Sequence, residues 1–516
     1  MMIPARPSYD RPTISLAAVA AGMTASVVFA ILLLVPIIGG ATVCVDDFAW
    51  VKLAHATPRL WQSLEQAWSA YLFFRPLDIV VNWIIDPLDL GSAAMLPFQA
   101  TGLLVLLAAV WRLTRALVPG GLLAPLAASI WLMLHTATQT SLWAAGATSQ
   151  TWCAAIGMWL MCHVLLASGD RALSVGSALL SLALSAVGVI SKELFVGWAS
   201  AAAVVVVARL GQRAAARQPL RLAATGMAIA AILSPPTLWL AIRMATSEFG
   251  RFAEPSADLH YSFQGPRTIV WNAALSTVGM FAQGPVHWAR LRGPPWNLVP
   301  FAGAALSFGL AAFGGSPGGR GQGSGWSRNA LPAAVVLGLI TVWPALPIRQ
   351  VSELYIMGPN ALIAVLVGAG VGRIIEGDPS SAGSYHRQSG ARAWLCGAVA
   401  CLAAIAVIGF ASRTYHFAIT WEYARALRVA ARALVEPEQA DGPLTIVVDD
   451  ALERGPVHSK YLVPPTWAAD LPNSFRTFRL GGVDLPLATF RAEAAPAAPG
   501  EKAVRLRCRV PTREIW

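Results

Sequence analysis

Long apolar segments follow one another along the first 413 residues, and this pattern constrains the fold more than any other feature. The first segment, residues 12–45, has 34 consecutive residues without a charge. About 20 apolar residues suffice to cross a bilayer, and the span exceeds the core of a signal peptide, so we expect an uncleaved anchor. Ten further segments lie near 94–111, 120–142, 150–169, 172–190, 194–208, 222–242, 296–314, 330–347, 355–372 and 393–412.

The composition agrees with this pattern. Hydrophobic residues make up 56% of the chain, charged residues only 13%, and the mean hydropathy is +0.57. A soluble protein has roughly a quarter of its residues charged and too little interior to bury so much apolar surface. Soluble enzymes, secreted disulfide scaffolds and disordered chains are therefore excluded. The sequence predicts a multi-pass α-helical membrane protein with about 11 transmembrane helices.

The basic residues predict the orientation. Residues 1–413 contain 25 Lys+Arg against 15 Asp+Glu, which supplies most of the net charge of +11. Such an excess marks loops on the cytoplasmic side and does not indicate nucleic-acid binding. With the N-terminus inside, eleven spans keep the arginine-rich loops inside. A twelfth span at 268–288 would move several of them outside, so we expect that segment to be re-entrant or to lie on the outer surface.

On this topology most acidic residues face outside. Acidic residues contribute little to membrane orientation, so the rule that places the basic loops inside does not explain this position. Eleven of the fifteen in residues 1–413 face outside: Asp46, Asp47, Glu65, Asp78, Asp86, Asp89, Glu193, Glu248, Glu254, Asp258 and Glu353.

Two regions differ from the apolar spans. The first outer loop, about 42–93, is rich in aromatic residues and has a helical, partly amphipathic pattern suited to the membrane interface. After residue 413 the chain becomes soluble in character, with strands expected at 445–448 and 504–510. We expect a transmembrane domain over 1–413 and a small extracytoplasmic α/β module over 414–516, whose role the sequence does not identify.

Several charged residues at the expected outer face are candidates for chemistry. Asp46 and Asp47 directly follow the first span, where a carboxylate can act as a base, coordinate a cation or simply end a helix. Arg75, in a Phe-Arg-Pro-Leu segment, can pair with phosphate or lie at the interface with its charge in water.

Two short junctions between spans add further charges. Lys192 and Glu193 join two apolar spans with almost no loop, and they suit either a phosphate or a local ion pair. Arg349, Glu353 and Tyr355 lie at another outer junction, and charges near membrane depth are functional candidates.

Together these residues offer a base and several cations on one side of the membrane. This combination suits transfer of a sugar from a lipid phosphate. The departing phosphate needs positive charge, and the acceptor hydroxyl needs a base on the opposite face of the sugar, which gives an inverting displacement.

The order of these motifs resembles the GT-C superfamily of membrane glycosyltransferases, in the branch that uses polyprenyl-phosphate sugars and includes protein O-mannosyltransferases. The resemblance covers roughly residues 40–375. It implies that Asp46 or Asp47 is the base, that Arg75, Lys192, Glu193, Arg349, Glu353 and Tyr355 bind substrate, and that the site faces outward from a bacterial inner membrane. Expected partners are membrane lipids, a polyprenyl-phosphate sugar donor and an extracytoplasmic acceptor.

The chain also departs from the pattern of that branch. Phe74 replaces a tyrosine, Leu354 replaces an arginine, and Thr136 and Gln139 replace a proline and a glutamate after His135. We therefore expect His135 to form hydrogen bonds at a helix end. Metal use stays open, and with no His or Cys ligand set only Mg²⁺ or Mn²⁺ bound by oxygen would fit.

Two alternatives belong to other classes. One is a glycan polymerase or ligase with a lipid-diphosphate donor, and the other is a membrane transporter. The outer acids and the soluble C-terminal region favour the glycosyltransferase.

Overall fold

The computed structural model describes most of the region between residues 57 and 414 and a few short strands beyond it. The described ranges are 57–70, 75–84, 95–118, 121–143, 148–166, 174–215, 222–246, 265–284, 294–315, 330–347, 353–376, 393–412, 444–448, 479–480, 483–484, 489–492 and 502–506, with single positions 24, 26, 28, 54 and 414. Within the expected anchor at 12–45, only positions 24, 26 and 28 are described, and all three are helical.

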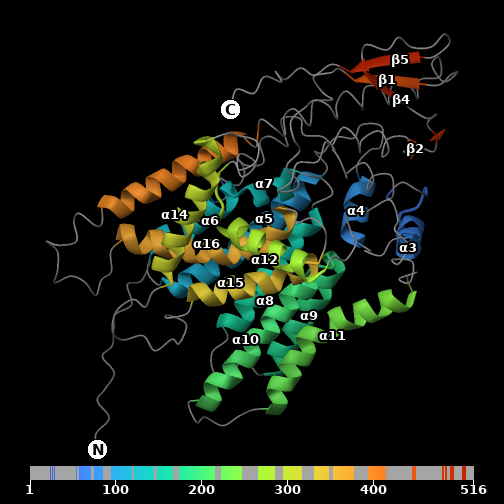
Figure 1. The fold of residues 1–516 in the computed structure, drawn as a ribbon. Helices are drawn as coiled ribbons and strands as arrows, with labels where there is room; N and C mark the ends of the chain where they lie inside the picture. The colour runs from blue at the N-terminus through green and yellow to red at the C-terminus, as the bar shows by residue number, and fades with distance from the viewer. Residues whose placement is uncertain are drawn as a thin grey trace, which may run out of the picture.

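The described part of residues 57–414 is helical and forms a bundle (Figure 1). Two short helices precede it: α3 (Leu60–Ala70) and α4 (Pro76–Ile84). The bundle contains α5 (Leu96–Leu117), α6 (Leu123–Leu134), α7 (Thr136–Trp143), α8 (Thr148–Leu166), α9 (Val175–Ser191), α10 (Phe195–Ala215), α11 (Leu222–Thr246), α12 (Pro266–Phe281), α14 (Val299–Gly314), α15 (Ala330–Val342), α16 (Glu353–Glu376) and the helix Ala393–Ser412, with one-turn 3₁₀ segments η6 (Trp296–Leu298) and η7 (Trp343–Ala345).

Six of the described helices are long and apolar enough to cross a membrane: Pro97–Leu117, Thr148–Leu166, Leu222–Arg243, Trp296–Gly314, Tyr355–Ile375 and Ala393–Ser412. Shorter apolar helices occupy Leu123–Leu134, Val175–Ser191, Phe195–Gly211 and Ala330–Ala345. These ten helices coincide with the ten segments expected after the anchor. By helix length and hydropathy the chain is therefore a multi-pass membrane protein, whereas the total of about 11 spans stays a prediction.

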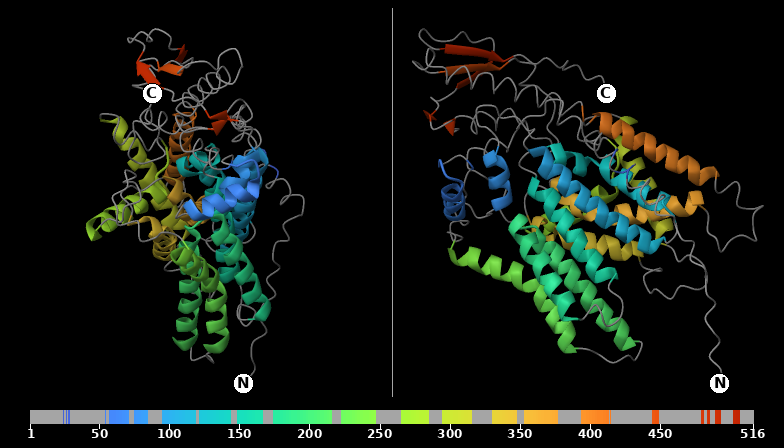
Figure 2. Two further views of the ribbon diagram at one scale, coloured as in Figure 1. Left: turned by 90° about the vertical axis from the view of Figure 1, so that its right-hand side faces the viewer. Right: turned by 180° about the vertical axis from the view of Figure 1, so that it is seen from behind.

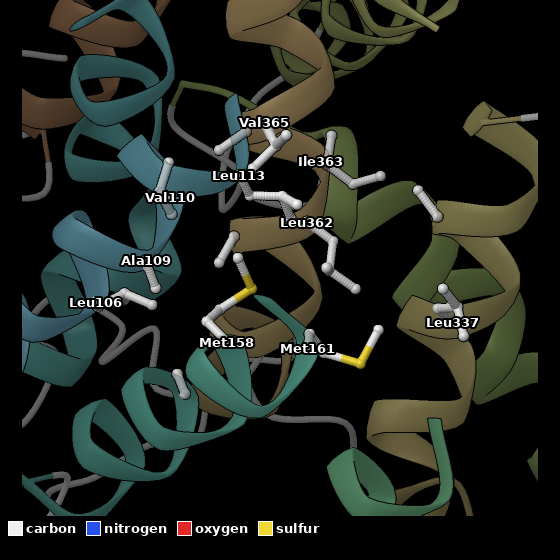
Figure 3. Close-up of a cluster of buried hydrophobic side chains, with 14 of the residues drawn as sticks. Leu106, Ala109, Val110, Leu113, Met158, Met161, Leu337, Leu362, Ile363 and Val365 are labelled. Atoms are coloured by element: carbon white, nitrogen blue, oxygen red, sulfur yellow. The ribbon is translucent and has the colours of Figure 1, made fainter. Parts of the chain in front are cut away.

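The bundle has an apolar interior and an apolar exterior. Inside, side chains of α5, α8, α15 and α16 interdigitate in one continuous cluster (Figure 3). Outside, large side chains such as Val175, Leu222 and Val270 remain 63%, 63% and 69% exposed. Apolar residues at such exposure need a lipid environment, since soluble proteins rarely expose large apolar patches.

Helix α16 is packed directly against the backbones of two neighbours. A Cβ atom added to Gly368 would meet the carbonyl oxygen of Ala124 on α6, and one added to Gly370 would collide with that of Leu310 on α14. Small residues permit this close approach, which is a common basis of helix association in membranes.

We expect Gly370→Ala to destabilise the bundle by about 1–3 kcal/mol, because overpacking against backbone atoms forces the two helices apart. The comparison is Gly309→Ala on α14, where an added Cβ meets nothing within 4 Å. Thermal unfolding in detergent should show a lowered Tm for the first variant alone. Equal Tm values for the two variants would contradict this packing.

Several helix starts that are expected to face outward lie at one end of the bundle. Trp198, near the start of α10, contacts Gly358, near the start of α16, so these two helices start at the same end. Asp78 and Arg75, at the start of α4, reach Ser149 at the start of α8 and Glu193 just before α10, which places these two starts together as well. Gln99 at the start of α5 donates to Thr148 at the start of α8, over 3.0 Å. We call this the Lys192 end, after the residue that joins α9 to α10.

The described part of the segment expected at 268–288 ends inside the bundle, at residue 284. Asn272 of α12 donates to the carbonyl of Leu346, just after η7, and Met280 lies against Gly338 of α15. Farther along, Gln283 donates to Trp131 of α6 over 2.8 Å. Because α14 then starts again toward the Lys192 end, with Gly303 beside Gln283, the contacts favour the re-entrant alternative.

Helix α11 bends at an internal proline pair, Pro235 and Pro236. Its last part leaves α9 and α10 and extends toward α3 (Figures 1 and 2). There Arg243 donates to the carbonyl of Trp68 over 2.8 Å and lies 4.5 Å from the centre of the Trp68 ring. Proline cannot continue the helical hydrogen bonds, which accounts for the bend.

Short strands are the only described part of the C-terminal hundred residues. They are β1 (Leu444–Val448), β2 (Arg479–Leu480), β3 (Val483–Asp484), β4 (Thr489–Ala492) and β5 (Lys502–Leu506). The first, fourth and fifth pair in parallel in the order β4-β1-β5. The strand expected at 445–448 is confirmed. The one expected at 504–510 is described only to residue 506, and the α/β module stays a prediction.

Candidate functional site

A bidentate ion pair joins the first loop to the junction between α9 and α10. The Arg75 guanidinium donates from Nε to one oxygen of Glu193 over 2.9 Å and from a terminal nitrogen to the other over 2.5 Å. Their side chains are 9% and 20% exposed. This pair therefore connects two of the motifs singled out in the sequence, which are 118 residues apart.

Local sequence explains how both partners are held. Arg75 directly precedes α4, and its carbonyl accepts the first helical hydrogen bond from Ile79. Pro76 occupies the first helical position, where its missing N–H costs nothing. On the other side, α9 ends at Ser191, and Phe195 packs where a Cβ on Gly188 would lie, so the turn to α10 is very short.

Lys192 lies inside this turn and is 2% exposed. Among the described residues its ammonium forms neither a hydrogen bond nor an ion pair. Burial lowers the pKa of Lys192 to about 8, and the nearby Arg75 charge adds to that effect, whereas Glu193 and Asp78 oppose it. A buried ammonium without a partner has capacity for an anion.

Asp78 is a fourth member of the cluster. The sequence predicted that it lies on the outer side of the membrane but did not indicate a site for it. It is fully buried, and its two oxygens accept from the backbone N–H and the hydroxyl of Ser149, over 3.0 and 2.7 Å. Ser149 is in the first turn of α8, where backbone N–H groups have no helical acceptor. Asp78 therefore caps α8 from the first loop.

Burial affects the two carboxylates of this cluster differently. Burial raises the pKa of Asp78, although Lys192, Arg75 and Ser149 oppose the rise. Burial acts in the same direction on Glu193, but there the Arg75 charge and hydrogen bonds hold the pKa below its ordinary value. Arg75 thus holds Glu193 ionised, whereas Lys192 has no ion-pair partner among the described residues.

The other expected site residues are only partly placed. Asp46, Asp47 and Arg349 lie outside the described residues. Glu353 is the first residue of α16, at the Lys192 end of the bundle. Tyr355, two residues later, is half-buried against the apolar core. The structure thus brings Arg75, Lys192 and Glu193 together and leaves the contacts of the remaining candidates untested.

The expected span at 120–142 is interrupted at His135. Helix α6 ends at Leu134, His135 adopts an extended conformation as its C-cap, and α7 follows. The His135 ring accepts from the N–H of Ala137 over 3.1 Å and contacts Asn360 over 2.8 Å. The expectation of a hydrogen-bonding histidine at a helix end is therefore confirmed.

A metal site built from the usual side chains is not present in the described ranges, which contain no group of three or more His, Cys, Asp or Glu residues. The Mg²⁺ or Mn²⁺ considered for Asp46 and Asp47 concerns residues outside those ranges.

Comparison with known proteins gives no family. No family model matches the chain, and no curated protein or solved structure is significantly similar to it.

Proposed function

We propose that the protein is an inverting membrane glycosyltransferase that takes a sugar from a polyprenyl-phosphate donor and passes it to an extracytoplasmic acceptor. In this proposal the site faces outward from a bacterial inner membrane. Asp46 or Asp47 is the base that activates the acceptor hydroxyl, and Lys192 binds the phosphate of the donor.

The observation that carries this proposal is the cluster at the Lys192 end. Arg75 holds Glu193 in a bidentate pair, and the neighbouring Lys192 ammonium is left buried and without an ion-pair partner among the described residues. A lipid phosphate leaving a sugar needs fixed positive charge where its own negative charge develops. A cation held in place by its surroundings supplies this charge without further reorganisation.

The test is release of free polyprenyl phosphate from labelled polyprenyl-phosphate sugars by purified protein in liposomes, with envelope extract as acceptor. We expect release with one sugar and its loss in Asp46→Asn or Asp47→Asn. Matched controls are Asp86→Asn and Asp89→Asn, which change carboxylates in the same expected loop. Full activity in a folded Asp46→Asn/Asp47→Asn double variant would refute the assigned base, and absence of binding to every donor would refute the reaction class.

The pKa of Lys192 predicts how donor affinity changes with pH. Deprotonation near pH 8 removes the charge that binds phosphate, so affinity for a polyprenyl-phosphate sugar should fall about tenfold between about pH 7 and pH 9. Equilibrium binding to liposomes that contain the donor measures this. Lys192→Arg, which stays charged, should bind without this pH dependence. An unchanged pH profile in that variant would show that another group titrates.

The same shift affects stability in the opposite direction. Because the folded-state pKa of about 8 lies below the ordinary value of 10.5, the unfolded chain binds more protons between these values. The contribution of Lys192 to stability therefore rises as the pH rises through that window and is lowest below it.

A transporter is the second candidate, and one observation favours it. The interrupted α6–α7 helix and the re-entrant α12 meet inside the bundle, and transporters often place binding sites at such discontinuous helices. Uptake of a sugar lipid into sealed liposomes without release of polyprenyl phosphate would support transport over transfer.

A further inference from the structure

Helix α6 ends inside the bundle instead of at its surface. His135, which caps it, is 2% exposed and lies beside Asn360. Asn360 is seven residues into α16, which places this helix end about 10 Å from the start of α16 at 1.5 Å per residue. A helix that ends in such a place leaves its last carbonyls without backbone donors.

Three amide side chains from different segments surround this end. Gln139 of α7 donates to the carbonyl of Leu134 over 2.9 Å. Gln283, just after α12, donates to that of Trp131 over 2.8 Å. Asn360 of α16 contacts Nδ1 of His135 over 2.8 Å. All three amides are thus anchored within about one turn of the same helix.

These contacts fix which way each amide points. A carbonyl only accepts hydrogen bonds, so the NH₂ groups of Gln139 and Gln283 must face Leu134 and Trp131. Nδ1 of His135 accepts from the N–H of Ala137 over 3.1 Å, so it is unprotonated, and the NH₂ nitrogen of Asn360 lies 2.8 Å from it.

The three amide oxygens that remain have no hydrogen-bond partner. They are Oε1 of Gln139, Oε1 of Gln283 and Oδ1 of Asn360, and all three residues are fully buried. Leaving a buried acceptor unpaired is unfavourable, and an amide oxygen, unlike a hydroxyl, cannot change into a donor. Their natural partner is therefore a group that brings donors or positive charge.

The surroundings favour one small positive charge. The segments that contact this point, α6, α7, residues 276–284 and residues 356–372, contain no Asp, Glu, Lys or Arg. The C-terminal end of α6 adds partial negative charge. Divalent ions in proteins are generally bound with carboxylates, which are lacking there, whereas carbonyl-type oxygens and buried helix ends bind alkali ions in membrane proteins.

We propose that the amide oxygens of Gln139, Gln283 and Asn360 hold a monovalent cation, Na⁺ or K⁺, at the C-terminal end of α6. By binding Gln139 and Gln283 together, the ion holds the break between α6 and α7 in contact with residues 282–284, which follow α12. The site is separate from the Lys192 cluster, and it stands whether or not the protein transfers sugars.

Thermal unfolding of the purified protein tests this site directly. Tm is measured in choline chloride and then with choline replaced stepwise by Na⁺ or K⁺ at constant ionic strength, about 150 mM. We expect Tm to rise and to saturate for at least one of the two ions, as it does for any ligand that binds the folded state alone.

Variants show where the ion binds. Gln283→Leu or Asn360→Leu should raise the half-saturating concentration about tenfold or more, and the matched control Gln150→Leu, a buried amide on α8, should leave it unchanged. Gln139→Glu, which adds a charge at the site, should lower that concentration and covers the case in which a leucine variant fails to fold. A Tm that does not differ between choline, Na⁺ and K⁺, or a shift unaffected by these substitutions, would overturn the proposal.

Discussion

Replacing Arg75 by leucine should destabilise the protein by about 3–5 kcal/mol and abolish sugar transfer. The side chain of Glu193 would then be left mostly buried without its bidentate partner. Removing one member of a buried ion pair is costly mainly because the other charge remains uncompensated. Thermal or denaturant unfolding in detergent measures the stability, and release of polyprenyl phosphate measures the activity.

The double variant Arg75→Leu/Glu193→Leu separates the two effects. With both charges replaced by apolar side chains, most of the lost stability should return, because buried pairs are often no more stabilising than apolar residues of similar volume. Activity should not return, because the surroundings of Lys192 have changed. A double variant as unstable as the single one would show that the pair itself holds the first loop in place.

Replacing Asp78 by alanine should cost about 2–5 kcal/mol. The N–H and hydroxyl of Ser149 would lose their acceptor in a place without water, and each unpaired buried donor costs about 1–3 kcal/mol. Unfolding of the variant in detergent, compared with the unchanged protein, measures the difference.

Asp78→Asn is the matched control. Its carbonyl can still accept from the N–H of Ser149 and its NH₂ group can donate to the hydroxyl, so stability should change by only about 1 kcal/mol. The charge is lost, however, and the pKa of Lys192 should fall further without the carboxylate that opposes its depression. If Asp78→Asn is as unstable as Asp78→Ala, Asp78 stabilises the protein through its charge and not through its hydrogen bonds to the start of α8.

The positions of the helices could be predicted largely from the sequence. Apolar length alone locates a membrane helix, because the bilayer demands both an apolar surface and internally paired backbone groups. The segments at 222–242 and 393–412 therefore lie within a few residues of the helices Leu222–Thr246 and Ala393–Ser412. The grouping of Arg75 with Lys192 and Glu193 was also accessible, because all three lie at expected outer ends.

What could not be predicted depends on contacts between distant segments. Asp78 looked like any acid in an outer loop, and only the position of Ser149 in the folded bundle gives it a role. A helix end at His135 was expected, but not that the polar residues of α7 after it are buried against other helices, which hydropathy alone does not reveal. The three amides that meet there come from segments up to 221 residues apart in the sequence, Gln139 and Asn360 being the most distant.

The contacts of α16 also bear on which parts of the molecule can move. At Gly368 and Gly370 this helix touches α6 and α14 through backbone atoms, so no layer of side chains can rearrange to let it slide or rotate. Helices α6, α14 and α16 should therefore show uniformly slow amide hydrogen exchange. By contrast, α3 and α4 are held to the bundle through side chains such as Arg75, Asp78 and Arg243. In the reaction that we propose, a lipid-linked substrate would reach Lys192 by displacement of these two short helices, with the central helices remaining fixed.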